Sequence, residues 1–328
     1  MPEARKTTSI NRKDFLRTGT LGALGLGLGL SESSAKAQEA KDKRARVVLA
    51  RSGESMTVEG RKEPRVVAGV LEQALCAFTG EKNAVAAMKH FVSPGDTVGV
   101  KMNVMMTATH PELVAAVARL LVEVGVKEDK IIIWDRDNAG IGIEGAYKRD
   151  KHFGYGTDAI SRIVTDEATV LINIPGLKSH WLSGMAAALK NWCGAVTRIN
   201  VRDQDTPFVI HKDSCADMGM LGALEPIRAK ERLVIVDAMR PLFEGGPQVN
   251  PVYLWNYGGL FLGTDPVAVD RLCLELLNRK RYQYRNRPWP LTPPAKHVFL
   301  ADTRYGLGIS ERSKIDLVAV GEKKDRLI

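Results

Sequence analysis

Residues 97–134, TVGVKMNVMMTATHPELVAAVARLLVEVGVKEDKIIIW, decide the fold. Pro111 stands where a helix accepts proline, at its first position, and Gly125 ends the apolar helical pattern that follows. Short apolar runs at Thr97–Lys101 and Ile131–Trp134 lie on either side of this helix and predict buried strands. A strand, a helix and a second buried strand are typical of a parallel βαβ unit, whose sheet is covered on both faces.

The same alternation continues along the chain. It predicts further strands at Arg46–Ala50, Thr169–Ile174, Leu233–Val236, Gly259–Leu262 and Ile315–Val320. Helices are expected at Val66–Phe78, Ala84–Phe91, Gly184–Trp192, Met218–Ala229 and Pro266–Leu277. The expected fold is therefore α/β, a mainly parallel sheet with flanking helices, in one domain or two modest lobes. In such sheets ligands usually bind beyond the carboxyl ends of the strands.

The first residues, 1–37, have the order of a secretory signal. A basic segment is followed by the weakly apolar, glycine-rich run Thr18–Leu30 and by Ala35-Lys36-Ala37, which suits cleavage before Gln38. Thirteen residues of this kind are too few to span a bilayer. We expect residues 38–44 to be a polar linker and residues 45–328 to form the exported α/β domain.

Residues 11–17, NRKDFLR, resemble a twin-arginine signal in their Phe-Leu pair and trailing cation. They depart from that pattern at Lys13, which replaces the second arginine, and at Asn11, which replaces the usual Ser or Thr. The resemblance implies recognition by the twin-arginine translocase, a periplasmic or otherwise exported location, and passage in the folded state, often with a cofactor already inserted.

Charge and cysteine content exclude several functional classes. Removal of residues 1–37 lowers the formal net charge from +9 to about +6, which does not argue for nucleic acid binding. No further segment is long and apolar enough for a transmembrane anchor. The four cysteines contain no C-x-x-C pair, which argues against an iron–sulfur cluster and haem attachment. Whether Cys193 and Cys215 form a disulfide stays open.

The strongest candidate site is PGLKSH at 175–180 together with GMAAALKN at 184–191. Lys178 and His180 are two residues apart, so an extended loop would point both side chains in the same direction. Lys190 and Asn191 add a cation and an amide at the far end of the expected helix. Small residues at that helix start would leave N–H groups free for an anion. The alternative is an ordinary strand, loop and helix with surface lysines.

Three other groups could contribute. Lys101 and Asn103 follow a strand end, and His110 stands at a helix start where Thr109 is the expected cap. His211 and Cys215 have the i, i+4 spacing of metal ligands on a helix and could form a three-ligand site with His180. Asp237 ends a strand and could organise the cations of the site. Asp265, directly before Pro266, is the expected cap of the helix that follows, and Asp270 could be structural or could hold a cation of the site.

In these segments the chain resembles a family without a defined activity, domain of unknown function 362. The resemblance rests on GVKMN at 99–103, THPE at 109–112, PGLKSH at 175–180, ALKNWCG at 188–194, His211, Asp237, GTDPVAVD at 263–270 and GLG at 306–308. It implies functional roles for Lys101, Asn103, His110, Lys178, His180, Lys190, Asn191 and His211. Many similar proteins add ferredoxin-like cysteine motifs, which this chain lacks around Cys215.

Two functional hypotheses follow. The first is an exported enzyme, assisted by a cofactor or metal, in which Lys101, Lys178 and Lys190 hold an anionic small molecule and His180 and His211 transfer protons or bind a ligand. The second is a periplasmic redox partner or cofactor-binding accessory protein with no catalysis of its own. The sequence fixes neither the cofactor nor the reaction.

Overall fold

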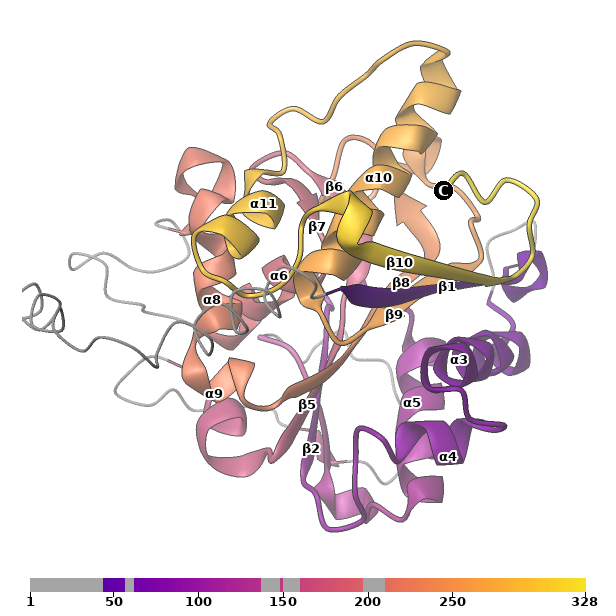
Figure 1. Ribbon diagram of the computed structural model, residues 1–328, viewed down its shortest axis with the longest axis vertical. Coiled ribbons are helices and arrows are strands. Elements are labelled where there is room, and N and C mark those ends of the chain that lie inside the picture. Colours follow the sequence, from indigo (N-terminus) through magenta and orange to yellow (C-terminus); the bar gives the residue numbers. More distant parts are fainter. Residues whose placement is uncertain (1–43, 57–61, 137–147, 150–159, 197–209) are drawn as a thin grey trace, which may run out of the picture. The chain divides into compact units, whose positions relative to one another are not determined.

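The computed structural model describes residues 44–56, 62–136, 148–149, 160–196 and 210–328. The expected signal segment and all but the last residue of the expected linker lie outside this part of the chain. Residues 44–328 form one compact unit, built on a mixed sheet with helices on both faces (Figure 1). The predicted α/β class is confirmed.

Most neighbouring strands of the sheet run parallel. Its main path has the order β10-β1-β9-β8-β5-β2-β3-β4, and β6 and β7 attach beside β8. The strands are β1 (Ala45–Arg51), β2 (Val98–Met102), β3 (Ile131–Trp134), β4 (Lys148–Arg149), β5 (Val170–Ile174), β6 (Gly176–His180), β7 (Gly184–Ala186), β8 (Glu231–Leu242), β9 (Gly259–Gly263) and β10 (Ile315–Gly321). Only β9 and β7 pair antiparallel with their neighbours among the described strands.

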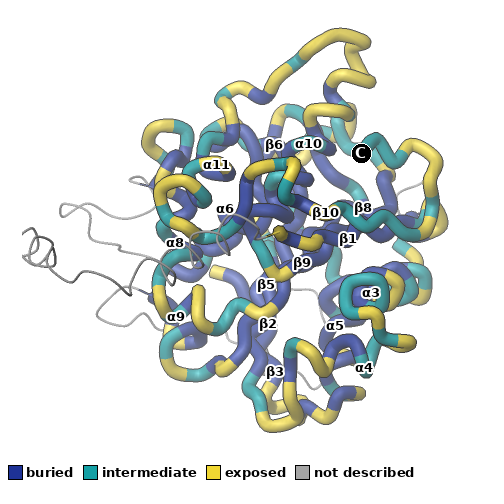
Figure 2. The backbone as a smooth tube through the Cα atoms, in the orientation of Figure 1, coloured by how far each residue is buried: buried dark blue, intermediate teal, exposed yellow. Residues whose placement is uncertain are grey.

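Alternation along the strands divides the core between the two faces. In β3, Ile131 and Ile133 pack with α3 (Pro64–Thr79), α4 (Ala84–Met88) and α5 (Pro111–Val124), whereas Ile132 and Trp134 face the other side. That second side is covered by α6 (Ala188–Asn191), α8 (Gly219–Ala223), α9 (Glu225–Arg228), α10 (Pro266–Arg285) and α11 (Lys296–Thr303). Buried backbone therefore runs through the centre of the unit, with exposed residues at the loops (Figure 2).

The sequence signals for helix starts and helix ends were informative. Helix α5 begins with Pro111 and ends at Gly125, whose φ of 106° lies in the left-handed region that favours glycine. Asp265 caps α10 by accepting hydrogen bonds from the N–H groups of Val267 and Ala268, at 2.9 Å each. Both assignments made from the sequence are confirmed.

Two predicted helices are wrong. Residues 184–186 form β7 rather than the start of a helix, because they pair with β6 and Gly184 has a φ of 74°. The helix expected at Met218–Ala229 is divided at Leu224, whose ψ of 130° is extended, and Pro226 opens the short α9 that follows. In addition, α10 is longer than expected, α4 ends three residues earlier, and α11 was not predicted.

Candidate functional site

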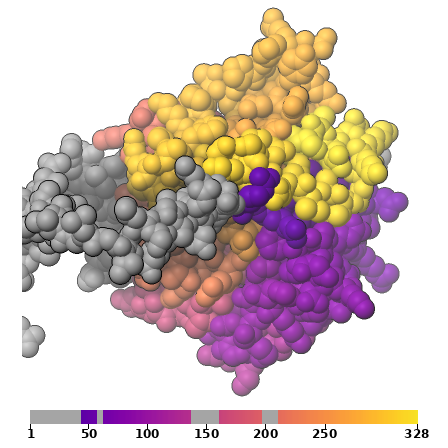
Figure 3. Space-filling model, in the orientation of Figure 1, coloured from indigo at the N-terminus to yellow at the C-terminus, as the bar shows by residue number. Residues whose placement is uncertain are grey.

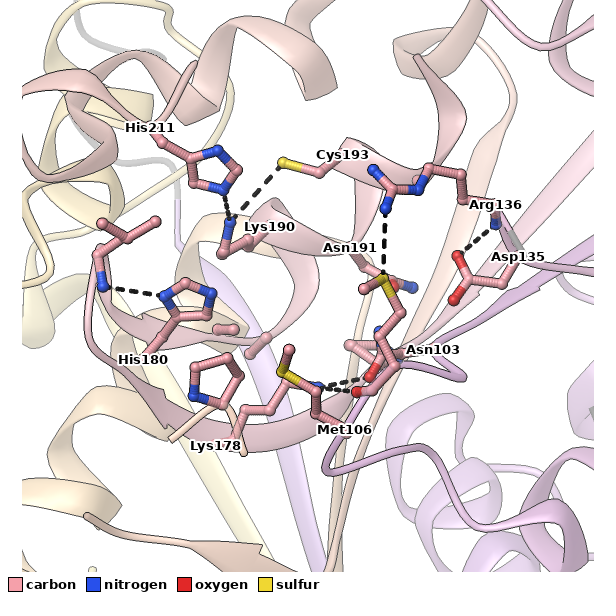
Figure 4. Close-up of a pocket in the computed structure, with 18 of the residues that line it drawn as sticks. Asn103, Met106, Asp135, Arg136, Lys178, His180, Lys190, Asn191, Cys193 and His211 are labelled. Carbon is pink, nitrogen blue, oxygen red and sulfur yellow. Dashed lines mark hydrogen bonds between the residues drawn. The ribbon is translucent and has the colours of Figure 1, made fainter. Parts of the chain in front are cut away.

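Strand β6 carries Lys178 and His180, which were expected on a loop. It pairs parallel with β8 and antiparallel with β7, where Lys178 faces Ala186 across the ladder. Because the two residues are separated by one position in a strand, their side chains leave the same face, as predicted. Both side chains line a cavity of about 260 Å³ (Figure 4).

The cavity brings together six of the nine predicted site residues: Asn103, Lys178, His180, Lys190, Asn191 and His211. Its rim is apolar, with Met105, Met106 and Trp181 exposed by 39, 47 and 61 %. Asp135 is the one acidic residue among the described residues that line it. The polar part of the lining is therefore dominated by cations and neutral donors.

Lys178 fixes the loop that follows β2. Its Nζ donates to the Oδ1 atom of Asn103 and to the carbonyls of Met105 (3.1 Å) and Thr107 (2.6 Å). Burial lowers the pKa of Lys178 to about 7; Asp135 opposes this shift, whereas the neighbouring lysines Lys190 and Lys101 reinforce it. The three oxygen acceptors suit the ammonium form of Lys178. Because its pKa is about 7, this lysine can hold or release a proton near neutral pH.

Lys190 and His211 form a pair. The Nζ atom of Lys190, on α6, lies 2.6 Å from Nε2 of His211 and 3.9 Å from the sulfur of Cys193 (Figure 4). An ammonium is a donor only, so Nε2 of His211 accepts and the ring proton belongs on Nδ1. The Lys190 side chain thus presents its charge to the cavity next to a neutral imidazole.

The contacts of His180 define its tautomer. Its Nδ1 accepts the N–H of Leu182 at 3.1 Å, so the proton of the neutral ring lies on Nε2. Burial, followed by the charge of Lys190, lowers the pKa of His180 to about 2. The ring is parallel to that of His211, with centroids 6.2 Å apart and planes 9° apart. His180 is therefore a neutral N–H donor at physiological pH.

Lys101 does not line the cavity. Its Nζ lies beneath the floor, 2.6 Å from Oδ1 of Asp135, 2.7 Å from the carbonyl of Met102 and 3.2 Å from Oδ1 of Asn191. Burial lowers the pKa of Lys101, and Asp135 opposes that shift. A Cβ at Gly194 would approach Oδ1 of Asp135 to 2.5 Å and Nζ of Lys101 to 2.9 Å, so a side chain at this position would displace the ion pair. The predicted ligand contact of Lys101 is thus replaced by a buried ion pair that supports the site.

His110 and Asp237 form a second pair outside the cavity lining. Oδ2 of Asp237 accepts from the backbone N–H of His110 at 2.7 Å and contacts its Nδ1 at 2.8 Å. Burial would raise the pKa of Asp237, but the contacts with His110 outweigh it and lower this pKa. Thr109 is not the cap of α5; its hydroxyl donates to the carbonyl of Ile174 instead, at 2.6 Å. Neither His110 nor Asp237 contacts the lysines of the cavity in the described hydrogen bonds.

The start of α6 is not free to bind an anion. The N–H groups of Ala188 and Leu189 donate to the carboxylate of Asp270, at 2.7 and 3.1 Å. Burial raises the pKa of Asp270 to about 7, and the two backbone donors oppose this shift. The prediction that a ligand occupies these N–H groups is wrong because a side chain of α10 already does.

One histidine near the site gave no signal in the sequence. His297, on α11, is fully buried, and neither ring nitrogen has a hydrogen-bond partner among the described residues. Burial, and then the charge of Lys190, lowers the pKa of His297 to about 3, and His297 in turn contributes to the low pKa of His180. His297 lies on α11, a helix that was not predicted, and it follows a proline-rich segment. No local sequence pattern therefore placed this histidine near the site.

The proposed metal-ligand set does not fit. Residues 212–218 are not a regular helix, since Asp213, Ser214 and Cys215 have positive φ, and the Cys215 thiol contacts the carbonyl of Leu182 at 3.7 Å. The Nε2 atom of His211 already accepts from the ammonium of Lys190. Within the described residues no group of three or more His, Cys, Asp or Glu side chains is arranged for a metal. Cys193 and Cys215 are free thiols rather than a disulfide.

Comparisons with known proteins find a family model that matches part of the chain. Residues 151–275 match the model of the domain of unknown function DUF362. This match supports the resemblance drawn from the motifs, and the matched DUF362 region contains β5 to β9 and with them Lys178, His180, Lys190 and His211. No curated protein matches the chain.

Among solved structures, the chain is similar to a Thermotoga maritima protein determined as a structural genomics target, with 11 % identity and a TM-score of 0.39. The similarity covers 65 % of this chain and 58 % of that protein, so this chain matches less than two thirds of its length. Separately, no helix in the described residues is long and apolar enough to cross a membrane.

Proposed function

We propose that this protein is an enzyme that binds a small anionic molecule in the cavity between β6, α6 and the loop after β2. The observation that carries this proposal is the charge of the lining: Lys178 and Lys190 face the cavity, and the single acid among the described lining residues, Asp135, is paired with Lys101. Unbalanced positive charge on two largely buried lysines favours an anion.

The residues have distinct roles in this proposal. Lys190 provides the charge that binds the anion, and the Nε2–H of His180 donates a hydrogen bond to it. Lys178, with a pKa of about 7, is the group that gains or loses a proton near neutral pH. His211 accepts a hydrogen bond from Lys190 and so holds its ammonium in place beside the cavity. An anion bound here would also offset the burial of His180 and raise its pKa.

We propose that the protein works after export, through the twin-arginine pathway, because its first residues resemble that signal. The same resemblance favours one alternative function. Proteins that cross a membrane folded often carry a cofactor, so the bound anion can be the phosphate or carboxylate end of an organic cofactor in a protein without its own catalysis. The donors at His180 and Lys190 favour such an organic anion over a metal ion.

Native mass spectrometry of the full chain, purified from cells that export it, tests this proposal. We expect one anionic small molecule per chain in the wild type and in Lys127→Met, an exposed control lysine, and none in Lys190→Met. A stoichiometric metal, or a neutral or cationic molecule in the same cavity, would contradict the proposal. Incubation of the recovered molecule with fresh protein distinguishes the two functions, because only an enzyme converts it.

A further inference from the structure

The second half of α10 and the loop after it carry a concentrated positive charge. Between Glu275 and Asp302 the chain contains no acidic residue, whereas it contains six cations: Arg279, Lys280, Arg281, Arg285, Arg287 and Lys296. We call residues 279–289 the α10 tip. This end of the helix extends away from the sheet, at the top of Figures 1 and 3. A charge of one sign over this length is not needed to fold the helix.

Only some of these cations have structural roles. Arg281 is buried, pairs with Glu244 and donates to the carbonyls of Phe243, Trp289 and Pro290. The guanidinium of Arg285 stacks on the ring of Trp289, 3.6 Å from its centroid, but Arg285 is exposed and its charge remains at the surface. Arg279 and Arg287 are exposed and have no ion-pair partner among the described residues. Their charges are therefore available to something outside the protein.

Aromatic and apolar side chains accompany the charges. Residues 282–288 are exposed without interruption, and Tyr282 and Tyr284 retain 51 and 50 % of their accessible surface. Tyr284 contacts the ring of Tyr253, whose neighbour in the chain, Val252, is 65 % exposed. Exposed tyrosines and an apolar side chain beside unpaired arginines suit a surface that is anionic at its boundary and apolar beneath it.

We propose that the α10 tip binds an anionic phospholipid membrane and holds the protein at its surface. Arginine guanidinium groups pair with lipid phosphates, and tyrosine rings lie at the boundary between headgroups and acyl chains. A cavity of about 270 Å³ lies nearby, but its acids Glu322 and Asp325 offset Lys280 and Lys324. The open face of the tip, rather than that cavity, is the binding surface. This attachment is independent of the anion site at β6.

Vesicle binding of the full chain tests the attachment. The test variant is Arg279→Gln, Arg285→Gln and Arg287→Gln together, and the control is Lys82→Gln, Lys89→Gln and Lys127→Gln, which removes the same charge from exposed positions beside α4 and α5. The N-terminal segment contributes equally to both. Each cation near an anionic surface is worth about a fivefold change in affinity, so three account for about a hundredfold.

With phosphatidylglycerol vesicles, the test variant is expected to bind about a hundredfold more weakly than the wild type and the control to stay within about fivefold. Tyr282→Ser, which changes no charge and no described contact, should also weaken binding. Equal affinities of test and control variants, or equal binding of the wild type to phosphatidylcholine vesicles, would overturn the proposal. The proposal would also be overturned if the test variant lost the wild type's binding to soluble polyglutamate but still bound vesicles. That result would make the α10 tip a docking surface for an acidic protein. Circular dichroism of each variant establishes that it is folded.

Discussion

Replacement of His297 by leucine should make the protein less sensitive to acid. In the unfolded chain this imidazole titrates at its ordinary pKa of about 6.5, whereas burial lowers its pKa to about 3 in the folded protein. Between these values the unfolded chain binds the additional proton, so the stability of the wild type decreases as the pH falls. The leucine variant lacks this contribution.

The magnitude follows from the two pKa values. From pH 8 to pH 5 the unfolded chain gains about 2 kcal/mol from protonation of this histidine, at about 1.4 kcal/mol per unit once the pH is below 6.5. Leucine is close to histidine in volume and removes two ring nitrogens that have no partner in the described residues. Any difference in packing between leucine and histidine is independent of pH. It therefore shifts the free energy of unfolding equally at every pH and does not change its slope against pH.

Urea unfolding of both proteins at several pH values between 8 and 5 measures the effect. The free energy of unfolding of His297→Leu, relative to the wild type, should increase by about 2 kcal/mol over this range. His90→Leu, which removes an imidazole that is 48 % exposed and lies beside Glu81, is the comparison variant. A constant difference between His297→Leu and the wild type would mean that His297 is protonated at its ordinary pKa in the folded protein, and the reasoning would be refuted.

Three other predictions concern different parts of the chain. Lys101→Met should destabilise the protein by about 3–5 kcal/mol in urea unfolding, because it leaves the carboxylate of Asp135 buried without its cation; a loss below about 1 kcal/mol would contradict this. The thiol of Cys273 is buried and its pKa is raised well above its usual range, so it should resist maleimide labelling until denaturant is added; rapid labelling of the native protein would place it elsewhere. Replacement of Arg12 and Lys13 by Gln should retain the precursor in the cytoplasm, and export in cells without the twin-arginine translocase would exclude that pathway.

Much of the fold could be predicted from the sequence because strong local signals coincide with it. Pro111 and Gly125 mark both ends of α5, and Asp265 with Pro266 marks the start of α10. Runs such as Ile131–Trp134 are apolar because both faces of the sheet are covered. The failures occur where pairing partners distant in sequence decide the structure. Residues 184–186 contain the small residues of a helix start, but they form a strand because β6 lies beside them.

The candidate site was predicted in part for the same reason. Lys178 and His180 were identified because they follow a strand end, Lys190 because it ends the expected helix, and His211 by its spacing to Cys215. The structure brings these four residues together. The sequence could not show that Lys101 pairs with Asp135, which is 34 positions away, or that Asp270 occupies the N–H groups of α6. His110 and Asp237 were assigned to the site by position alone, and their mutual hydrogen bonds instead join α5 to β8.

Calorimetric titration of anions into the wild type, Lys190→Met and His180→Gln tests the central claim most directly. A panel of oxalate, citrate, phosphate and pyrophosphate serves as probe, and Lys127→Met is the matched control. At least one anion should bind the wild type and the control equally, and Lys190→Met should bind it tenfold or more weakly, since a hydrogen bond to a charged group contributes about 1.5–3 kcal/mol. His180→Gln should lose less, because glutamine keeps an N–H donor. Equal affinity of Lys190→Met and the wild type for every anion that binds would contradict the assignment of this cavity as the anion site.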